Sequence, residues 1–341
     1  LLHFLTADYW NIDFVKREQE LNIPIYEIKN ISVDSYKKVC LFSGGMDSLI
    51  GAIDLLHDNK DKILFISHYD SIFKGAKADQ DKIIPILKEN FPKSFDHIQT
   101  RIDIKGSSRE TTLRSRSFMF LSQAIYAASN LAPNIEIILP ENGTIALNHP
   151  LTASRYSTCS TRTAHPYVIK ELNEIAQILG LPNNIMNPYE FKTKGEMVEE
   201  CVDKELFKIT FPLSCSCAKR GTRKDIRENP HAINCGICMP CIYRRAALHK
   251  IGLDTEDIGT NALNPNDLIR DLMHIPDMPA FLDFLAHDLS KKEIEANLLC
   301  NGSLPLDELS NYADVVVRVR EELKQWIEDK GNEEIKHRIH I

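Results

Sequence analysis

The stretch from residue 39 to 50 constrains the fold of this chain more than any other. A short apolar run is followed by Ser43-Gly44-Gly45 and then by apolar residues at helical spacing. This pattern predicts a buried parallel strand, a tight turn and a helix. The N–H groups and dipole of the helix start, together with the hydroxyls of Ser43 and Ser48, would then converge on one point. The sequence therefore predicts a cradle for a phosphate or pyrophosphate.

The acidic residue in this turn, Asp47, indicates that a metal ion accompanies the nucleotide. A carboxylate would repel bare phosphate, so we expect Mg²⁺ at the site. The stretch is neither the common P-loop nor the dinucleotide fingerprint. It resembles the SGGxDS loop of the ATP pyrophosphatases, which cleave ATP between its α- and β-phosphates. The resemblance implies that the departing pyrophosphate is held by Ser43, Gly44, Gly45, Asp47 and Ser48. A tight turn with incidental serines is the alternative.

Composition is that of an ordinary globular protein of about two domains. The 341 residues are 43% hydrophobic and 26% charged, with a formal net charge of −7, which offers no general attraction to nucleic acid or to a membrane. No apolar run is long enough to span a bilayer, and no leader pattern opens the sequence. We expect a cytoplasmic enzyme without membrane or nucleic-acid partners.

Further apolar runs predict a doubly wound α/β fold with a parallel sheet. Strands are expected at 62–69, 97–104 and 135–140, alternating with helices at 77–90, 118–128 and 168–179. The residues before 38 predict a strand-rich extension with a strand at 22–28. Because ligands bind at the carboxyl ends of such strands, His68 is expected to shape the adenine pocket rather than to act as a base.

Two basic positions are predicted near the phosphates. Arg109, Arg114 and Arg116 precede the 118–128 helix, where guanidinium groups suit phosphate, and the resemblance aligns Arg116 with an arginine of related enzymes. Thr193, followed three residues later by Glu196, is a capping box that opens a helix. The resemblance implies that Lys194 lies near the phosphates, with Lys192 as the alternative. Asp47, Lys194 and Arg116 are therefore the expected catalytic residues.

The segment from 144 to 166 lacks periodicity and is predicted to be a functional loop beside the crevice. Its polar side chains suit a flat heterocycle that carries a carboxylate, and Glu141 is suited to accept N–H bonds from an aminopyrimidinone edge. The expected substrate-binding residues are Glu141, Asn142, Arg162 and His165. Cys159 is expected to be a packed cysteine rather than a nucleophile.

Cysteine spacing predicts a metal site. Cys235, Cys238 and Cys241 form two successive CxxC spacings, and Cys215 or Cys217 would supply the fourth sulfur. Four sulfurs with no open position favour structural zinc. An iron–sulfur cluster is the alternative.

Together these motifs resemble QueC, the family of 7-cyano-7-deazaguanine (preQ0) synthases. The resemblance covers residues 38–253 and adds Arg244 and the helix end at Gly252 to the features above. By that match the zinc ligands are Cys215, Cys235, Cys238 and Cys241. Residues 156–166 depart from the family's base-binding run, the spacer before Cys235 is long and basic, and both ends are extended. In these features the sequence is similar to the QueC-like proteins of antiviral defence operons, of the Qat and type IV CBASS kinds.

The resemblance implies an N-terminal extension (1–37), an ATP pyrophosphatase domain (38–253) and a helical C-terminal extension (254–341). The implied reaction uses ATP, Mg²⁺ and a zinc-stabilised fold to adenylate the carboxylate of 7-carboxy-7-deazaguanine. Ammonia would then give the amide and, after a second activation, the nitrile preQ0, whereas the amino group of a partner protein would give a conjugate. A tRNA-modifying ATP pyrophosphatase and a non-catalytic nucleotide-binding adaptor are the alternatives, and a homo-oligomer is left open.

Overall fold

The computed structural model describes most of the chain. The described residues are 1–16, 18, 36–58, 61–69, 75–102, 116–151, 162, 164–218, 220, 228–263 and 277–341. Several predictions from the sequence lie outside them: the strand at 22–28, Arg109, Arg114, Cys159 and most of the basic spacer before Cys235.

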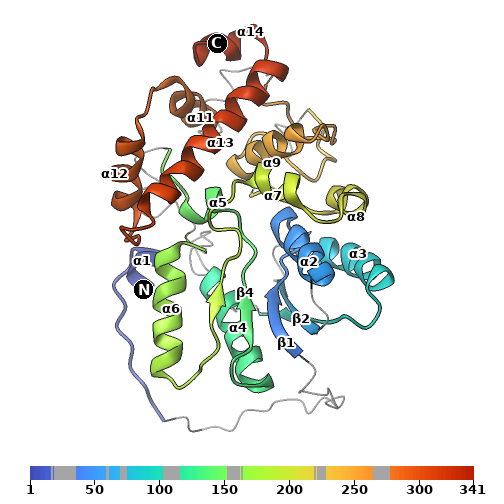
Figure 1. Ribbon diagram of the computed structural model, residues 1–341, viewed down its shortest axis with the longest axis vertical. Coiled ribbons are helices and arrows are strands. Elements are labelled where there is room, and N and C mark those ends of the chain that lie inside the picture. The colour runs from blue at the N-terminus through green and yellow to red at the C-terminus, as the bar shows by residue number, and fades with distance from the viewer. Residues whose placement is uncertain are drawn as a thin grey trace.

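A five-stranded, all-parallel sheet forms the centre of the first half of the molecule (Figure 1). Its strands are β1 (Tyr36–Leu41), β2 (Lys62–Tyr69), β3 (Phe95–Arg101), β4 (Glu136–Ile138) and β5 (Ile185–Met186). Their order is β3-β2-β1-β4-β5. The order reverses between β1 and β4, and in such sheets a ligand crevice lies outside the strand ends at that point. The predicted α/β class with a parallel sheet is confirmed.

Helices cover both faces of this sheet. On one face lie α2 (Met46–Asp58) and α3 (Gly75–Asn90), and on the other lie α4 (Arg116–Leu131) and α6 (Pro166–Ile178). The alternation of β1 explains this arrangement, because Cys40 packs with the α2 side and Val39 with the α4 side. Since both faces are covered, the central strands are apolar throughout.

Shorter elements connect the sheet to the rest of the chain. They are α1 (Leu2–Thr6), α5 (Gly143–Leu147), α7 (Lys194–Glu200), α8 (Lys204–Thr210), the 3₁₀ turn η3 (Phe211–Leu213) and α9 (Met239–Lys250). The helix predicted from the Thr193 capping box is confirmed as α7. The segment expected to be irregular begins instead with α5, which is too short to show helical periodicity in the sequence.

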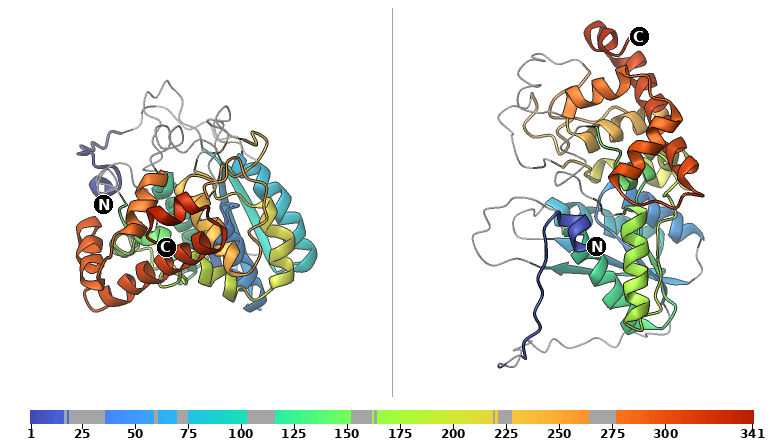
Figure 2. Two further views of the ribbon diagram at one scale, coloured as in Figure 1. Left: turned by 90° about the horizontal axis from the view of Figure 1, so that it is seen from above. Right: turned by 90° about the vertical axis from the view of Figure 1, so that its left-hand side faces the viewer.

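The C-terminal region is helical, as expected. It comprises α11 (Asp277–Ala286), α12 (Lys291–Asn301), α13 (Leu309–Lys330) and α14 (Glu333–Arg338). These helices stack at the end of the molecule away from the lower part of the sheet (Figure 2). They share one apolar core with α9 and three cysteines of the metal motif.

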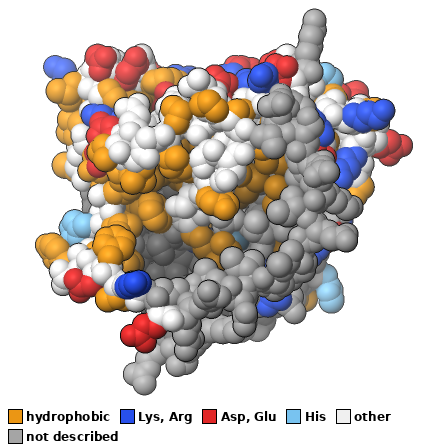
Figure 3. Space-filling model, turned by 90° about the horizontal axis from the view of Figure 1, so that it is seen from below, with side chains coloured by type: hydrophobic (Ala, Val, Ile, Leu, Met, Phe, Trp, Pro, Cys, Tyr) orange, Lys and Arg blue, Asp and Glu red, His pale blue; other side chains and the backbone are white. Residues whose placement is uncertain are grey.

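The opposite end of the molecule exposes apolar side chains (Figure 3). Exposed apolar residues include Tyr126 of α4, Ile178 at the end of α6 and Leu179 directly after it. Among the described residues, no helix is both long and apolar enough to cross a membrane.

Candidate functional site

The glycine turn follows β1 at the point where the strand order reverses. Gly44 has φ of +86°, in the region that side chains rarely adopt. A Cβ added at Gly44 would lie 3.2 Å from Cβ of Asp79 and 3.3 Å from Cγ of Gln80. The buried amide of Gln80 donates to the Ser43 carbonyl at 3.0 Å. The backbone conformation therefore favours glycine here, and the close approach of α3 leaves little room for a side chain.

Hydroxyl groups line the turn on its open side. The Oγ atoms of Ser43 and Ser48 lie 3.1 Å apart, and the Ser48 hydroxyl donates to the Gly45 carbonyl at 3.0 Å. The Gly45 N–H donates to Ser43 Oγ at 3.2 Å. Asp47 and Ser48 occupy the first turn of α2, where the helix dipole favours an anion. The geometry is that of a small anion cradle whose acidic member, Asp47, needs a cationic partner.

Lys194 provides that cation from a distant part of the chain. Its ammonium forms an ion pair with Asp47 Oδ1, and both side chains are buried, with exposed fractions of 5% and 10%. Lys194 is the first residue of α7, whose start is fixed by the Thr193 capping box. Asn142 Nδ2 donates to the other oxygen, Asp47 Oδ2, at 2.7 Å. The Asp47 carboxylate is thus held on both oxygens.

The loop after β4 supplies this amide and a second carboxyl. Asn142 also caps α5, because its Oδ1 accepts from the Ile145 N–H at 3.0 Å. Gly143 allows the loop to approach the neighbouring chain, since a Cβ there would lie 2.2 Å from the Glu190 carbonyl oxygen. Asn142 therefore positions Asp47 and α5, a role that differs from the expected substrate contact.

Glu141 and Asp47 share a low-dielectric site and have opposite pKa shifts. Burial, followed by repulsion from Asp47 and a hydrogen bond with it, raises the pKa of Glu141 well above its usual value. Burial also acts to raise the pKa of Asp47, but Lys194 and the hydrogen bonds from Glu141 and Asn142 outweigh it and lower the pKa. One carboxyl of the pair is thus an acid that can donate a proton, and the other is an anion.

Two cavities flank the glycine turn. One, of about 280 Å³, is lined by Asp47, Lys194 and the start of the cysteine segment. The other, of about 320 Å³, is lined by His68, Arg116 and Phe120. Ser43, Ser48, Pro140 and Glu141 line both. The site thus extends across the turn and can accommodate an elongated ligand with its charged part at the serines.

Some of the predicted site residues line these two cavities, and others lie elsewhere in the structure. His68 and Arg116 line the second cavity, and Arg116 opens α4 as expected. Arg162 and His165 are not brought to either cavity. Arg162 stacks on Phe4 and donates to its carbonyl at 2.8 Å, and it lines a separate cavity between α1 and α12. His165 is buried as the N-cap of α6. The expectation that both line a pocket with Glu141 is therefore corrected.

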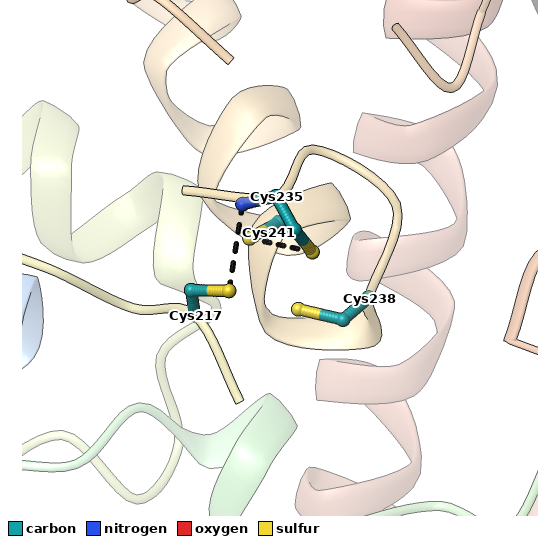
Figure 4. Close-up of side chains that lie close together, drawn as sticks. All are labelled: Cys217, Cys235, Cys238 and Cys241. Carbon is teal, nitrogen blue, oxygen red and sulfur yellow. Dashed lines mark hydrogen bonds between the residues drawn. The ribbon is translucent and has the colours of Figure 1, made fainter. Parts of the chain in front are cut away.

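Four cysteines come together beside the first cavity (Figure 4). Their sulfur atoms, from Cys217, Cys235, Cys238 and Cys241, all lie within 4.8 Å of one another. Cys235 Sγ and Cys241 Sγ are 3.8 Å apart. Tetrahedral zinc with Zn–S bonds of about 2.3 Å requires sulfur atoms about 3.8 Å apart. The donor set and this spacing fit a structural zinc ion.

Hydrogen bonds among the four sulfur atoms shift the cysteine pKa values in both directions. They lower the pKa of Cys217 and raise the pKa of Cys238 and Cys241. A thiolate is the form that binds a metal. Three of the four cysteines are buried, so an ion bound here would be held away from solvent.

The fourth ligand differs from the one that the resemblance implied. Cys217 joins the cluster, whereas the Cys215 thiol donates to the side chain of Asn234 at 3.6 Å and lines the first cavity. The Cys215 N–H donates to the Gly44 carbonyl at 3.4 Å. In a regular extended segment, residues two positions apart lie on the same face, so the chain departs from regular extension between these two cysteines. The sulfur of Cys217 lies with the other three cysteines, and that of Cys215 lies against Asn234.

Sequence reasoning missed several residues that hold the site together. Gln80 gives no motif signal, although it links the ends of β1 and β2 by donating to the carbonyls of Ser43 and His68. Buried Asp79 pairs with Arg220 of the cysteine segment.

The chain was compared with known proteins. No protein-family model and no curated protein matches it. The conclusions on function therefore depend on the motifs and on the geometry of the site.

Proposed function

We propose that this chain is an ATP pyrophosphatase of the PP-loop type, similar to QueC. The observation that carries the proposal is the position of the Ser43-to-Ser48 turn. It lies at the switch point of the parallel sheet, with Lys194 and Asn142 on its acidic residue and with a cavity on either side. A cradle of N–H groups and hydroxyls with one acidic residue suits pyrophosphate bound together with Mg²⁺.

The proposed reaction joins a carboxylate to an amine. The substrate carboxylate attacks the α-phosphorus of ATP, pyrophosphate leaves, and an amine then displaces AMP from the acyl adenylate. Ser43, Ser48 and the N-terminus of α2 hold the pyrophosphate, and Lys194 and Arg116 stabilise charge on the phosphates. Because Lys194 and Asn142 already contact the two oxygens of Asp47, Mg²⁺ would be held there only through the remaining lone pairs, and it would supply charge neutralisation. Such chemistry needs positioning more than a nucleophilic side chain.

The proposed substrate is 7-carboxy-7-deazaguanine, and the amine belongs to ammonia or to a partner protein. Support for a deazaguanine comes from the resemblance and from the position of Glu141, which lines both cavities. Conjugation to a protein amine would agree with a role in antiviral defence. The zinc ion holds the cysteine segment, whose Cys215 and Ser216 line the first cavity.

The test is pyrophosphate release from ATP and Mg²⁺, with and without 7-carboxy-7-deazaguanine and ammonia, followed by mass spectrometry. We expect the deazaguanine to stimulate release. Amide or nitrile would identify ammonia as the acceptor, and AMP without either product would indicate a protein amine. If the deazaguanine has no effect, the substrate assignment is wrong. If ATP binds but is never cleaved, the chain is a nucleotide-binding adaptor.

A further inference from the structure

The C-terminal helix α13 contacts the start of α7, the helix that carries Lys194. The guanidinium of Arg318 lies 2.7 Å from the Glu196 carboxylate and donates to the Phe191 carbonyl at 2.7 Å. Phe191 and Glu196 lie on either side of the α7 start. One residue of α13 therefore holds the chain on both sides of this helix start.

A second residue of α13, Glu322, contacts the capping residue itself. The Thr193 hydroxyl donates to Glu322 Oε1 at 2.6 Å and accepts from the Glu196 N–H at 3.0 Å. The hydroxyl proton of Thr193 is donated to Glu322 of α13, and a lone pair of the same oxygen accepts the N–H that caps α7. Thr193 is fully buried, and the Glu322 side chain is 11% exposed. The hydroxyl thus couples α13 to the first turn of α7.

The Glu322 carboxylate also packs closely against the backbone of α7. A Cβ added at Gly195 would lie 2.5 Å from Glu322 Oε1. Glycine at 195 therefore allows the carboxylate to reach Thr193. Lys250 of α9 lies 3.4 Å from the same oxygen and provides a positive charge nearby. Between Gly195 and Thr193 stands Lys194, whose ammonium reaches Asp47.

We propose that Glu322 is a positioning residue for Lys194, acting through the Thr193 hydroxyl that begins α7. Residue 322 lies in the segment that the family resemblance does not cover, so the C-terminal helices form part of the site's framework. The inference rests on the proposed function only in that Lys194 is taken to act at the phosphates. The geometric claim concerns the position of Lys194 and can be tested without turnover.

The first measurement is the rate at which an acylating reagent modifies Lys194, followed by peptide mass spectrometry with Lys192 as the internal reference. We expect Glu322→Ala to raise the rate at Lys194 by about tenfold, because loss of the hydrogen bond favours opening of the α7 start. Glu322→Gln keeps an acceptor for Thr193 and should retain most of the protection. Glu328→Ala, at an exposed position of the same helix, is the matched control and should leave the rate of Lys194 modification unchanged.

Two further results decide the proposal. If Glu322→Ala is unfolded by thermal melting, Gly195→Ala displaces the same carboxylate and should raise Lys194 labelling. An unchanged Lys194 rate in a folded variant, or an equal rise at Lys192, would overturn the positioning role. With turnover as the readout, we expect kcat for pyrophosphate release to fall while KM for ATP stays within about twofold. If the wild-type chain releases no pyrophosphate, the proposed function fails, and the labelling still decides whether Glu322 positions Lys194.

Discussion

Lys194 and Asp47 form a buried ion pair between residues 147 positions apart in the chain. The pair joins the first turn of α2 to the first turn of α7, and Asn142 completes it from the loop after β4. Three separate segments thus meet at one carboxylate. Charges buried in this way are held by their partners, so a change to either member has consequences for both stability and function.

Removal of the lysine charge should be costly. We expect Lys194→Met to lower the free energy of unfolding by about 3 kcal/mol, because Asp47 is then buried without its cation. Pyrophosphate release should be lost as well. Lys192→Met is the matched control, since its ion pair with Glu200 is partly exposed and should contribute about 1 kcal/mol or less. Denaturant unfolding measures the change in the free energy of unfolding for both variants. Equal effects at 192 and 194 would contradict the assignment.

Replacing Cys217 or Cys215 with serine should have different effects on the metal content of the protein. Cys217→Ser should lose zinc, whereas Cys215→Ser should retain about one equivalent per chain. Elemental analysis of the purified variants measures this. A strong chelator should also lower the melting temperature of the wild-type protein, because metal binding stabilises the folded state. Retention of zinc by the Cys217 variant and its loss from the Cys215 variant would reverse the assignment of the fourth ligand.

Alanine substitutions at two glycines with similar φ angles can distinguish the cost of backbone strain from the cost of steric crowding. Gly180 has φ of +72° with nothing within 4 Å of an added Cβ, whereas the Cβ at Gly44 would meet Asp79 and Gln80. Gly180→Ala should cost about 1 kcal/mol from backbone strain alone. Gly44→Ala should cost more and should weaken binding of a non-hydrolysable ATP analogue. Calorimetric titration and thermal melting provide the two readouts, and equal costs would show that the turn has room to adjust.

The raised pKa of Glu141 has a defined effect on stability. Between the unfolded value of 4.5 and the higher folded pKa, the folded state holds a proton that the unfolded chain has lost. Stability from this group is therefore full below pH 4.5 and is lost as the pH rises toward the folded pKa. Glu141→Gln removes the titration, so its melting temperature relative to wild type should increase from pH 5 to pH 8. A constant difference over that range would show that Glu141 does not have a raised pKa.

Local patterns in the sequence predicted much of the sheet and part of the site. The strand at 62–69 appears as β2 with the expected bounds, and the capping box at Thr193 opens α7. These features depend on residues close together in the chain. Arg162 and His165 lie away from Glu141 because both contact Phe4, which is far from them in the chain. No spacing in the sequence encodes such a long-range contact.

The choice between Cys215 and Cys217 shows the same limit. Spacing indicates that one of them completes the metal site, but the choice depends on which sulfur lies beside those of Cys235, Cys238 and Cys241. The family resemblance favoured Cys215, whereas in the structure that thiol donates to the side chain of Asn234. The β5 strand, with only two residues, is likewise beyond sequence patterns because its pairing with β4 defines it.

The apolar core shared by α9, the cysteine segment and α11 to α14 limits how the chain can be shortened. Tyr243 of α9 packs on Phe281 of α11, and Arg245 stacks on Trp326 of α13. A version that ended after α9 would expose these contacts to water and would need polar residues on that side of α9. A protein with the glycine turn and the cysteines but without these helices should carry a different set of residues on α9.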